Sequence, residues 1–149
     1  MKGWKQIFQA NGQETKAGVA ILISDKIDFQ RRAIKSDPEG HFIIHKGRIH
    51  QEDRNIVNIY APNIGAPKYI KKILEDFKKD INSNTIIVGD FNTPLSKMDR
   101  SSKQNMKKDI VSLNNTLDEM DLTDIYIESF SYQRSKYTSF QVYMELFQR

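Results

Sequence analysis

The stretch TIIVGDFNTP, residues 85–94, decides the fold of this 149-residue sequence. Its apolar β-branched run ends at Gly89, and an acid and an amide follow at Asp90 and Asn92. A short apolar run without alternation indicates a strand that is buried on both faces, and glycine allows the backbone to turn where that strand leaves the core. Because open α/β sheets bind ligands beyond the carboxyl ends of their strands, we expect Asp90 and Asn92 to lie at such an edge.

A second stretch, NIVNIYAPN at residues 55–63, repeats the pattern of an apolar run, an aromatic residue and a polar loop. Together the two strands would bring Tyr60, Asn63, Asp90 and Asn92 to one rim. A lone GDxN pattern is more often a turn than a site, with Asp90 capping the turn and Asn92 satisfying loop backbone groups. Two such stretches joined by an amphipathic helix are more specific.

The pattern of strands and helices along the chain predicts an α/β protein of one domain. We expect residues 25–40 to be a mixed segment and a loop, and residues 18–24 to form a central strand. The two halves of residues 41–51 are expected to form a hairpin around Gly47, which leaves His41, His45 and His50 at solvent-facing positions. Strands are expected at residues 3–8, 18–24, 41–46, 48–51, 55–60, 86–88, 122–127 and 137–140, and helices at residues 67–81 and 101–121.

Composition excludes some functions. The chain has no cysteine, which excludes disulfides, thiolate metal sites and thiol nucleophiles. Its formal net charge of +4 tilts modestly toward a polyanionic partner, although such an excess is often only a solubility feature. No apolar segment resembles a signal peptide or a membrane span, so we expect an intracellular protein, nuclear or cytoplasmic.

Three stretches resemble the endonuclease/exonuclease/phosphatase superfamily: GVAIL at residues 18–22, NIYAPN at 58–63 and GDFNTP at 89–94. Longer stretches, among them SDPEGHFIIHKG and GDFNTPLSKMDRS, are similar to the endonuclease domain of mammalian long interspersed (non-LTR) retrotransposons. The resemblance extends over residues 2–138. It implies a sandwich of two sheets flanked by helices, as in DNase I and exonuclease III, and magnesium-dependent nicking of DNA.

The resemblance also implies roles for single residues. Asp90 would position or deprotonate the attacking water, and Asp90 and Asn92 would hold Mg²⁺ or a phosphate oxygen. Tyr60 would donate a hydrogen bond to the phosphate, and Asn63 would contact it or order the loop. Two positions near the DNA are matched by Arg100, in the MDRS segment, and by Thr138. On the residues alone, Arg100 and Thr138 are more often structural or neutral.

Four segments of active family members have no counterpart in these 149 residues. Two precede the matching region, and one of them ends in Gln-Glu, whose Glu binds the metal. Two follow it, an Ile-Asp-His segment and a Ser-Asp-His segment with the catalytic histidine. We therefore expect a sandwich that is incomplete at both ends, with little or no activity. The loss of core strands also threatens stability, since folded domains are typically stable by only about 5–15 kcal/mol.

The last residues depart from the family pattern. After Thr138 the chain continues SFQVYMELFQR, and another reading frame would give text close to the family sequence. A frameshift near Ser139 is our hypothesis, and the coding DNA would contradict it by failing to encode an Ile-Asp-His continuation. The domain is therefore expected at residues 1–138, with a divergent tail at 139–149.

Two other functions remain open at this stage. The chain could be a non-catalytic retrotransposon remnant that binds nucleic acid weakly, or a phosphoesterase acting on a small phosphorylated molecule. Salt-dependent DNA binding without cleavage would favour the remnant. Turnover of a small phosphorylated molecule would favour the phosphoesterase, which the retrotransposon-like loops disfavour.

Overall fold

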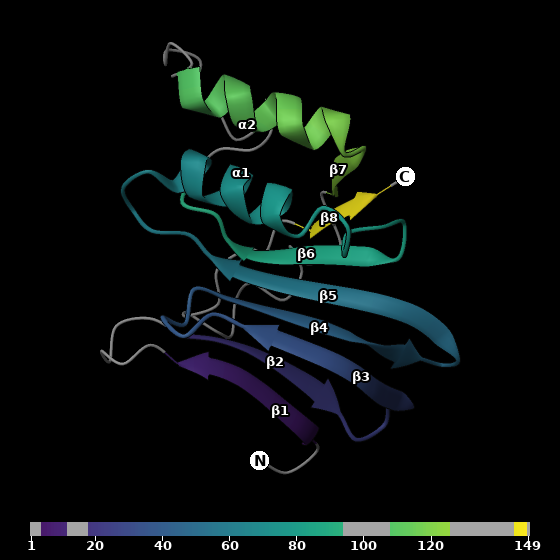
Figure 1. Cartoon of the computed structure of the whole chain (residues 1–149). Coiled ribbons are helices and arrows are strands. Elements are labelled where there is room, and N and C mark those ends of the chain that lie inside the picture. Colours follow the sequence, from purple (N-terminus) through teal and green to yellow (C-terminus); the bar gives the residue numbers. More distant parts are fainter. Residues whose placement is uncertain (1–3, 12–17, 94–107, 126–144, 149) are drawn as a thin grey trace, which may run out of the picture.

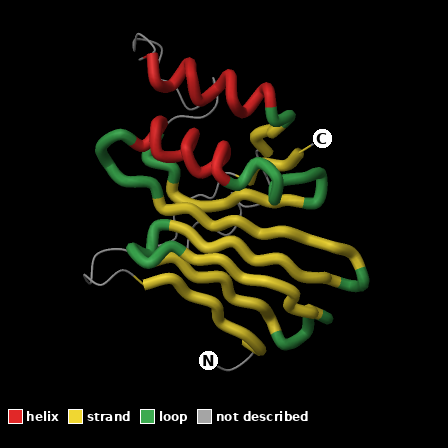
Figure 2. The backbone as a smooth tube through the Cα atoms, viewed as in Figure 1, coloured by secondary structure: helices red, strands yellow, loops and turns green. Residues whose placement is uncertain are grey.

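Two sheets and two helices make up the fold in the computed structural model, which describes residues 4–11, 18–93, 108–125 and 145–148 (Figures 1 and 2). The smaller sheet pairs β1 (Trp4–Asn11) with β2 (Gly18–Ser24) in antiparallel fashion. The larger sheet has six strands in the order β3-β4-β5-β6-β8-β7. Its strands are β3 (Phe29–Ser36), β4 (Phe42–Ile49), β5 (Glu52–Tyr60), β6 (Thr85–Asp90), β7 (Leu122–Ile125) and β8 (Glu145–Gln148). The helices are α1 (Ala66–Asp76) and α2 (Lys108–Glu119).

The two faces of the larger sheet are covered to different degrees. Strand β6 was expected to be buried on both faces, but buried residues alternate in it with half-buried ones, and β5 ends with the same alternation. On one face, Ile59 and Ile87 pack in a cluster with residues of both helices, among them Ile70 and Leu113. On the other face, strand β2 packs with Phe29 and Ile43, and Tyr60 is half-buried against this second cluster. The result is an α/β sandwich: β1 and β2 cover one face of a mixed sheet and the helices cover the other.

Strands β5 and β6 are parallel neighbours because α1 returns the chain between them. Gly65 precedes α1 with a φ of 77°, a left-handed conformation that glycine adopts without steric cost. Pro67 lies in the first turn, as the sequence predicts. The helix ends at Asp76 rather than continuing to Ile81, which nevertheless packs in the helix-side core.

The predicted hairpin around Gly47 is wrong. Strand β4 runs straight through this residue. Glycine is needed there because a β-carbon would lie 2.7 Å from the ring of Phe29. The turn comes later, at His50 and Gln51, whose φ angles of 49° and 68° are both positive. Positive φ at both central residues is the pattern of a type I′ hairpin turn.

Other differences concern the edges. His45 was expected to face solvent but is fully buried, with its ring centroid 4.7 Å from that of Phe29. Strand β3 replaces the mixed segment, and β2, expected to be central, pairs with β1 alone among the described residues. The tail contributes β8, which the sequence did not predict, whereas the expected strand at 137–140 lies outside the described residues. Within the described part of the chain, neither helix is long and apolar enough to cross a membrane.

Candidate functional site: a rim formed by three strands

Gly89 brings the end of β6 unusually close to β5. Its φ is 140°, and a β-carbon there would lie 1.8 Å from the carbonyl oxygen of Ile59. Side chains other than hydrogen are therefore excluded at this position. The glycine predicted to turn the backbone thus also allows the close approach of the two strands immediately before Asp90.

Tyr60 and Asp90 lie opposite one another in the parallel register of β5 and β6. The pairing continues past the strands, because Ala61 N donates a 2.8 Å hydrogen bond to Asp90 O. Register partners project to the same face of a sheet. The side chains of Tyr60 and Asp90 therefore lie next to each other at the carboxyl ends of both strands, as the sequence predicts.

Asn92 is tied to both strands. Its backbone N donates to Asp90 Oδ1 at 3.1 Å, and its side-chain Nδ2 donates to Ala61 O at 2.7 Å. Its φ of 46° is left-handed, a conformation that asparagine tolerates better than most residues. These two hydrogen bonds are the ones expected if Asp90 only caps the turn and Asn92 only satisfies backbone groups of the loop. They also hold Asn92 beside Asp90, with Oδ1 of Asn92 as the atom that could bind a metal.

Of the other predicted site residues, Asn63, Arg100 and Thr138, the structure describes only Asn63. Asn63 is exposed in the loop between β5 and α1, so it belongs to the same edge without a bond that joins it to Asp90 among the described residues. Arg100 and Thr138 lie outside the described residues. The structure therefore brings together Tyr60, Asp90 and Asn92.

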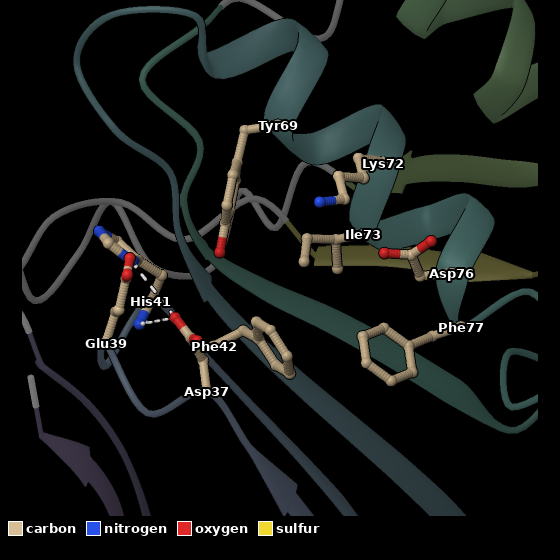
Figure 3. A pocket seen from close by; sticks show the side chains of 9 residues that line it. All are labelled: Asp37, Glu39, His41, Phe42, Tyr69, Lys72, Ile73, Asp76 and Phe77. Atoms are coloured by element: carbon tan, nitrogen blue, oxygen red, sulfur yellow. Dashed lines mark hydrogen bonds and ion pairs between the residues drawn. The ribbon is translucent and has the colours of Figure 1, made fainter.

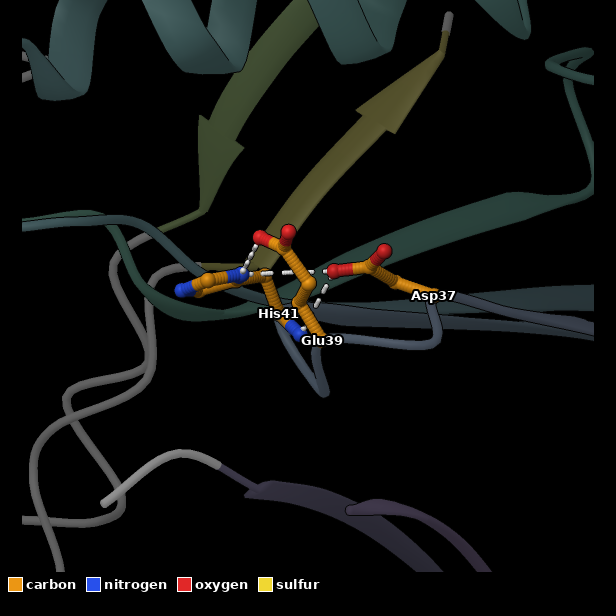
Figure 4. Close-up of side chains that lie close together, drawn as sticks. All are labelled: Asp37, Glu39 and His41. Carbon is orange, nitrogen blue, oxygen red and sulfur yellow. Dashed lines mark hydrogen bonds and ion pairs between the residues drawn. The ribbon is translucent and has the colours of Figure 1, made fainter. Parts of the chain in front are cut away.

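A histidine and two acids extend the rim to β4. Tyr60 N donates to His41 O at 2.7 Å, just before β4 begins. His41 Nδ1 lies 3.3 Å from Asp37 Oδ2 and 3.7 Å from Glu39 Oε2 (Figure 4). One ligand atom from each of the three residues lies within 4.8 Å of the other two, a spacing that could hold a cation. The contacts of His41 Nδ1 with the two carboxylates account for this spacing without a cation.

Sequence reasoning missed this cluster, although a signal was present. Asp37, Pro38 and Gly40 are the residue types preferred at positions i, i+1 and i+3 of a type I turn. Gly40 N donates to Asp37 O at 3.0 Å, which closes that turn. The turn reverses the chain so that His41 lies against Asp37. The predicted hairpin over residues 41–51 instead placed His41 at a solvent-facing position.

A cavity of about 310 Å³ adjoins the cluster between α1 and the start of β4 (Figure 3). Burial, followed by the negative charges of Asp37 and Glu39, raises the pKa of Tyr69 to about 12, so its hydroxyl stays protonated at neutral pH. The cavity is lined by Asp37, Glu39, His41, Phe42, Tyr69, Lys72, Ile73, Asp76 and Phe77.

The Asp90–Asn92 pair has the donor chemistry that Mg²⁺ prefers. Both residues offer oxygen atoms, and magnesium is commonly bound by one or two carboxylates together with waters and substrate phosphates. Asp90 Oδ1 already accepts the Asn92 N–H, which orients the carboxylate in the way that outer-shell hydrogen bonds orient metal ligands. The residues present therefore fit a magnesium ion that is also held by substrate.

Solved structures with a similar fold were found, although no family model matches the chain. The endonuclease domain of TRAS1, a telomere-specific non-LTR retrotransposon, aligns with the whole chain at a TM-score of 0.64 and 16% identity. The chain has a DNase I-like fold. D. rerio TDP2, solved with a single-strand DNA product, aligns with 98% of it at a TM-score of 0.58 and 9% identity. A functionally unknown protein of Enterococcus faecalis V583 aligns with 80% at a TM-score of 0.54 and 17% identity.

The likeness extends over only part of each of these proteins. The chain spans 68% of the TRAS1 domain, 62% of the TDP2 chain and 50% of the E. faecalis protein. At these identities the similarity establishes the DNase I-like fold, with neighbours that include nucleases. A shared fold does not fix function, so the function of this chain has to be argued from the residues at its rim, Tyr60, Asp90 and Asn92.

Proposed function

We propose that this chain carries the phosphodiester-binding rim of a magnesium-dependent DNA endonuclease. One observation supports it most: Tyr60 and Asp90 lie in register at the carboxyl ends of two parallel strands, and Asn92 is bonded to both strands. Ligands of open α/β sheets bind at edges of this kind. The fold shared with a retrotransposon endonuclease domain and with a protein solved with single-strand DNA agrees with it.

Each rim side chain has a task that its atoms suit. The carboxylate of Asp90 positions or deprotonates the attacking water, since it lies at the solvent end of its strand. Asn92 would hold the metal through Oδ1 or a phosphate oxygen through Nδ2, and the Tyr60 hydroxyl donates a hydrogen bond to a phosphate oxygen. Magnesium, when bound, stabilises charge on the phosphate. Asn63, Arg100 and Thr138 are the proposed contacts to the rest of the DNA.

Turnover by these 149 residues alone is expected to be weak or absent. The family resemblance assigns the principal metal carboxylate and the catalytic histidine to segments without a counterpart in this sequence. Binding of DNA is therefore a better readout of the rim than cleavage. The binding is expected to depend on magnesium, because an ion shared by Asp90 and a phosphate removes the repulsion between the two anions.

The test is fluorescence anisotropy of a short labelled single-stranded DNA, with magnesium or with a chelator. Wild-type protein should bind about fivefold or more tightly with magnesium, a modest coupling of about 1 kcal/mol. Asp90→Asn should lose this response. The matched control is Asp118→Asn, which removes an exposed carboxylate from α2 and should keep the response. An equal magnesium response in Asp90→Asn and wild type would contradict the proposal.

The alternative, a nucleic-acid-binding remnant without a metal site, predicts a different pattern. Its binding would weaken with added salt, magnesium included, would not be strengthened by magnesium, and would not respond to any rim substitution that keeps the net charge. Nicking of supercoiled plasmid with magnesium checks the expectation of weak turnover. Weak cleavage by wild type that is lost in Asp90→Ala would support the site, and efficient cleavage would show that the expectation of weak turnover was wrong.

A further inference from the structure

A histidine–aspartate pair, His41 and Asp37, lies beside Tyr60 in the turn that precedes β4. The side chains of His41 and Asp37 are 23% and 18% exposed, so both are largely enclosed at the edge of the sheet. Glu39, by contrast, is 82% exposed. The rim therefore runs across three neighbouring strands, with His41 before β4, Tyr60 at the end of β5 and Asp90 at the end of β6.

Asp37 holds His41 at two points. Its Oδ2 accepts a 3.0 Å hydrogen bond from the His41 backbone N and lies 3.3 Å from Nδ1 of the imidazole (Figure 4). A carboxylate on one imidazole nitrogen selects the tautomer and the ring orientation. Glu39 approaches the same nitrogen only at 3.7 Å from its exposed position, so Asp37 is the partner that fixes the ring.

The fixed imidazole faces the ring of Tyr60. The two rings are stacked, with centroids 6.4 Å apart and planes only 4° from parallel. On the helix side, the ring of Tyr69 meets the imidazole edge-on at 5.7 Å (Figure 3). Both distances lie within the range of favourable aromatic pairs. The backbone bond from Tyr60 N to His41 O adds a third restraint on the same strand end.

We propose that His41, held by Asp37, is a positioning residue that sets the orientation of the Tyr60 ring and so aims its hydroxyl at the substrate phosphate. The functional half of this inference rests on the proposed role of Tyr60 in binding a phosphodiester. The structural half, the orientation of the ring, does not depend on that role. His41 acts through Tyr60 rather than on the reacting atoms.

The first test reads the Tyr60 ring directly. The protein is labelled with 3-fluorotyrosine, and the ¹⁹F resonance of Tyr60 is identified by its loss in Tyr60→Phe. His41→Leu should shift this resonance because the stacked ring is gone, and Asp37→Asn should shift it in the same direction by a smaller amount. Glu39→Gln and His50→Asn, a matched acid and a histidine at the opposite end of β4, should leave it unchanged. An unshifted resonance in His41→Leu would overturn the proposal.

The second test asks whether the effect reaches DNA. His41→Leu should weaken magnesium-dependent binding of short single-stranded DNA about threefold to tenfold, the factor expected for loss of one aromatic pair. The same substitution should cost nothing further in a Tyr60→Phe background, because the hydroxyl that His41 aims is already absent. Additive losses in the double variant would overturn the role through Tyr60.

The two readouts also separate this inference from the proposed function. If wild-type protein binds no DNA in the presence of magnesium, the proposed function fails, and the functional half of the inference fails with it. The ¹⁹F shift in Asp37→Asn, which keeps the imidazole but loosens it, would still decide whether the fixed His41 orients Tyr60. If DNA binds and responds to Asp90→Asn but His41→Leu changes neither readout, the proposed function stands and this inference is wrong.

Discussion

Acid should destabilise this fold through His45. The imidazole is fully buried against Phe29, and burial, followed by the positive charge of Arg31, lowers its pKa from the ordinary 6.5 to about 4. Below about pH 6.5 the imidazole of His45 is protonated in the unfolded chain, whereas in the folded protein it is protonated only below about pH 4. The folded state therefore loses stability as the pH falls through this window.

The magnitude follows from the shift. A pKa difference of about 2.5 units corresponds to about 3 kcal/mol in all, of which about 2 kcal/mol is lost between about pH 7 and pH 5. Urea unfolding at both pH values measures it, and the quantity to compare is the loss on acidification rather than the stability at one pH.

A non-titrating variant isolates this contribution from that of the carboxylates. His45→Leu removes the titrating group and should lose about 2 kcal/mol less than wild type between the two pH values, whatever its stability at neutral pH. His50→Asn removes an exposed histidine from the β4–β5 turn and should behave as wild type. Equal losses in His45→Leu and wild type would refute the reasoning.

Two further substitutions probe the scaffold, one at Gly89 beside the rim and one at Asp80, near the amino-terminal end of β5. Gly89→Ala places a β-carbon 1.8 Å from Ile59 O, where contacts below 3.0 Å are not tolerated, so the strands must separate. The free energy of unfolding should fall by about 4 kcal/mol or more, which should abolish a cooperative thermal melt. Near-wild-type melting would contradict this expectation. Asp80 pairs with Lys35 and Lys46, whose hydrogen bonds lower its pKa, so the pairs stabilise the fold at neutral pH and this stability is lost as the pH falls. Because these groups are partly exposed, Asp80→Asn should cost at most about 1 kcal/mol in urea unfolding at low salt and less at high salt, and a salt-independent cost would argue against ion pairing.

The sequence predicted those parts of the fold whose pattern is local and strong. The apolar run before Gly89 indicated a strand, which β6 is, although buried and half-buried positions alternate in it instead of both faces being buried. The neighbouring run ending at Tyr60 placed the side chains of Tyr60 and Asp90 at one edge. The α/β class followed from the pattern of strands and helices. The two-sheet sandwich followed from the family resemblance, because two-sheet packing depends on contacts between distant segments. The roles of Asp90, Asn92 and Tyr60 in chemistry remain predictions.

The sequence failed where a tertiary contact overrides local preference. Gly47 suggested a turn, but glycine is needed there because the Phe29 ring lies over it within the sheet. His45 alternates like a surface residue, yet β2 covers that face of β4 and buries it. The pairing of His41 with Asp37 depends on a turn whose signal is present but was not used to place side chains.

The most direct test of the central claim locates the metal. Manganese can replace magnesium, and its paramagnetism broadens the amide resonances of nearby residues, so a titration in the presence of short single-stranded DNA maps the bound ion. The account predicts broadening centred on Asp90 and Asn92, lost in Asp90→Asn and kept in Asp37→Asn. Broadening that is unaffected by Asp90→Asn, or that disappears only in Asp37→Asn, would place the ion at the Asp37–Glu39–His41 cluster or elsewhere and contradict it.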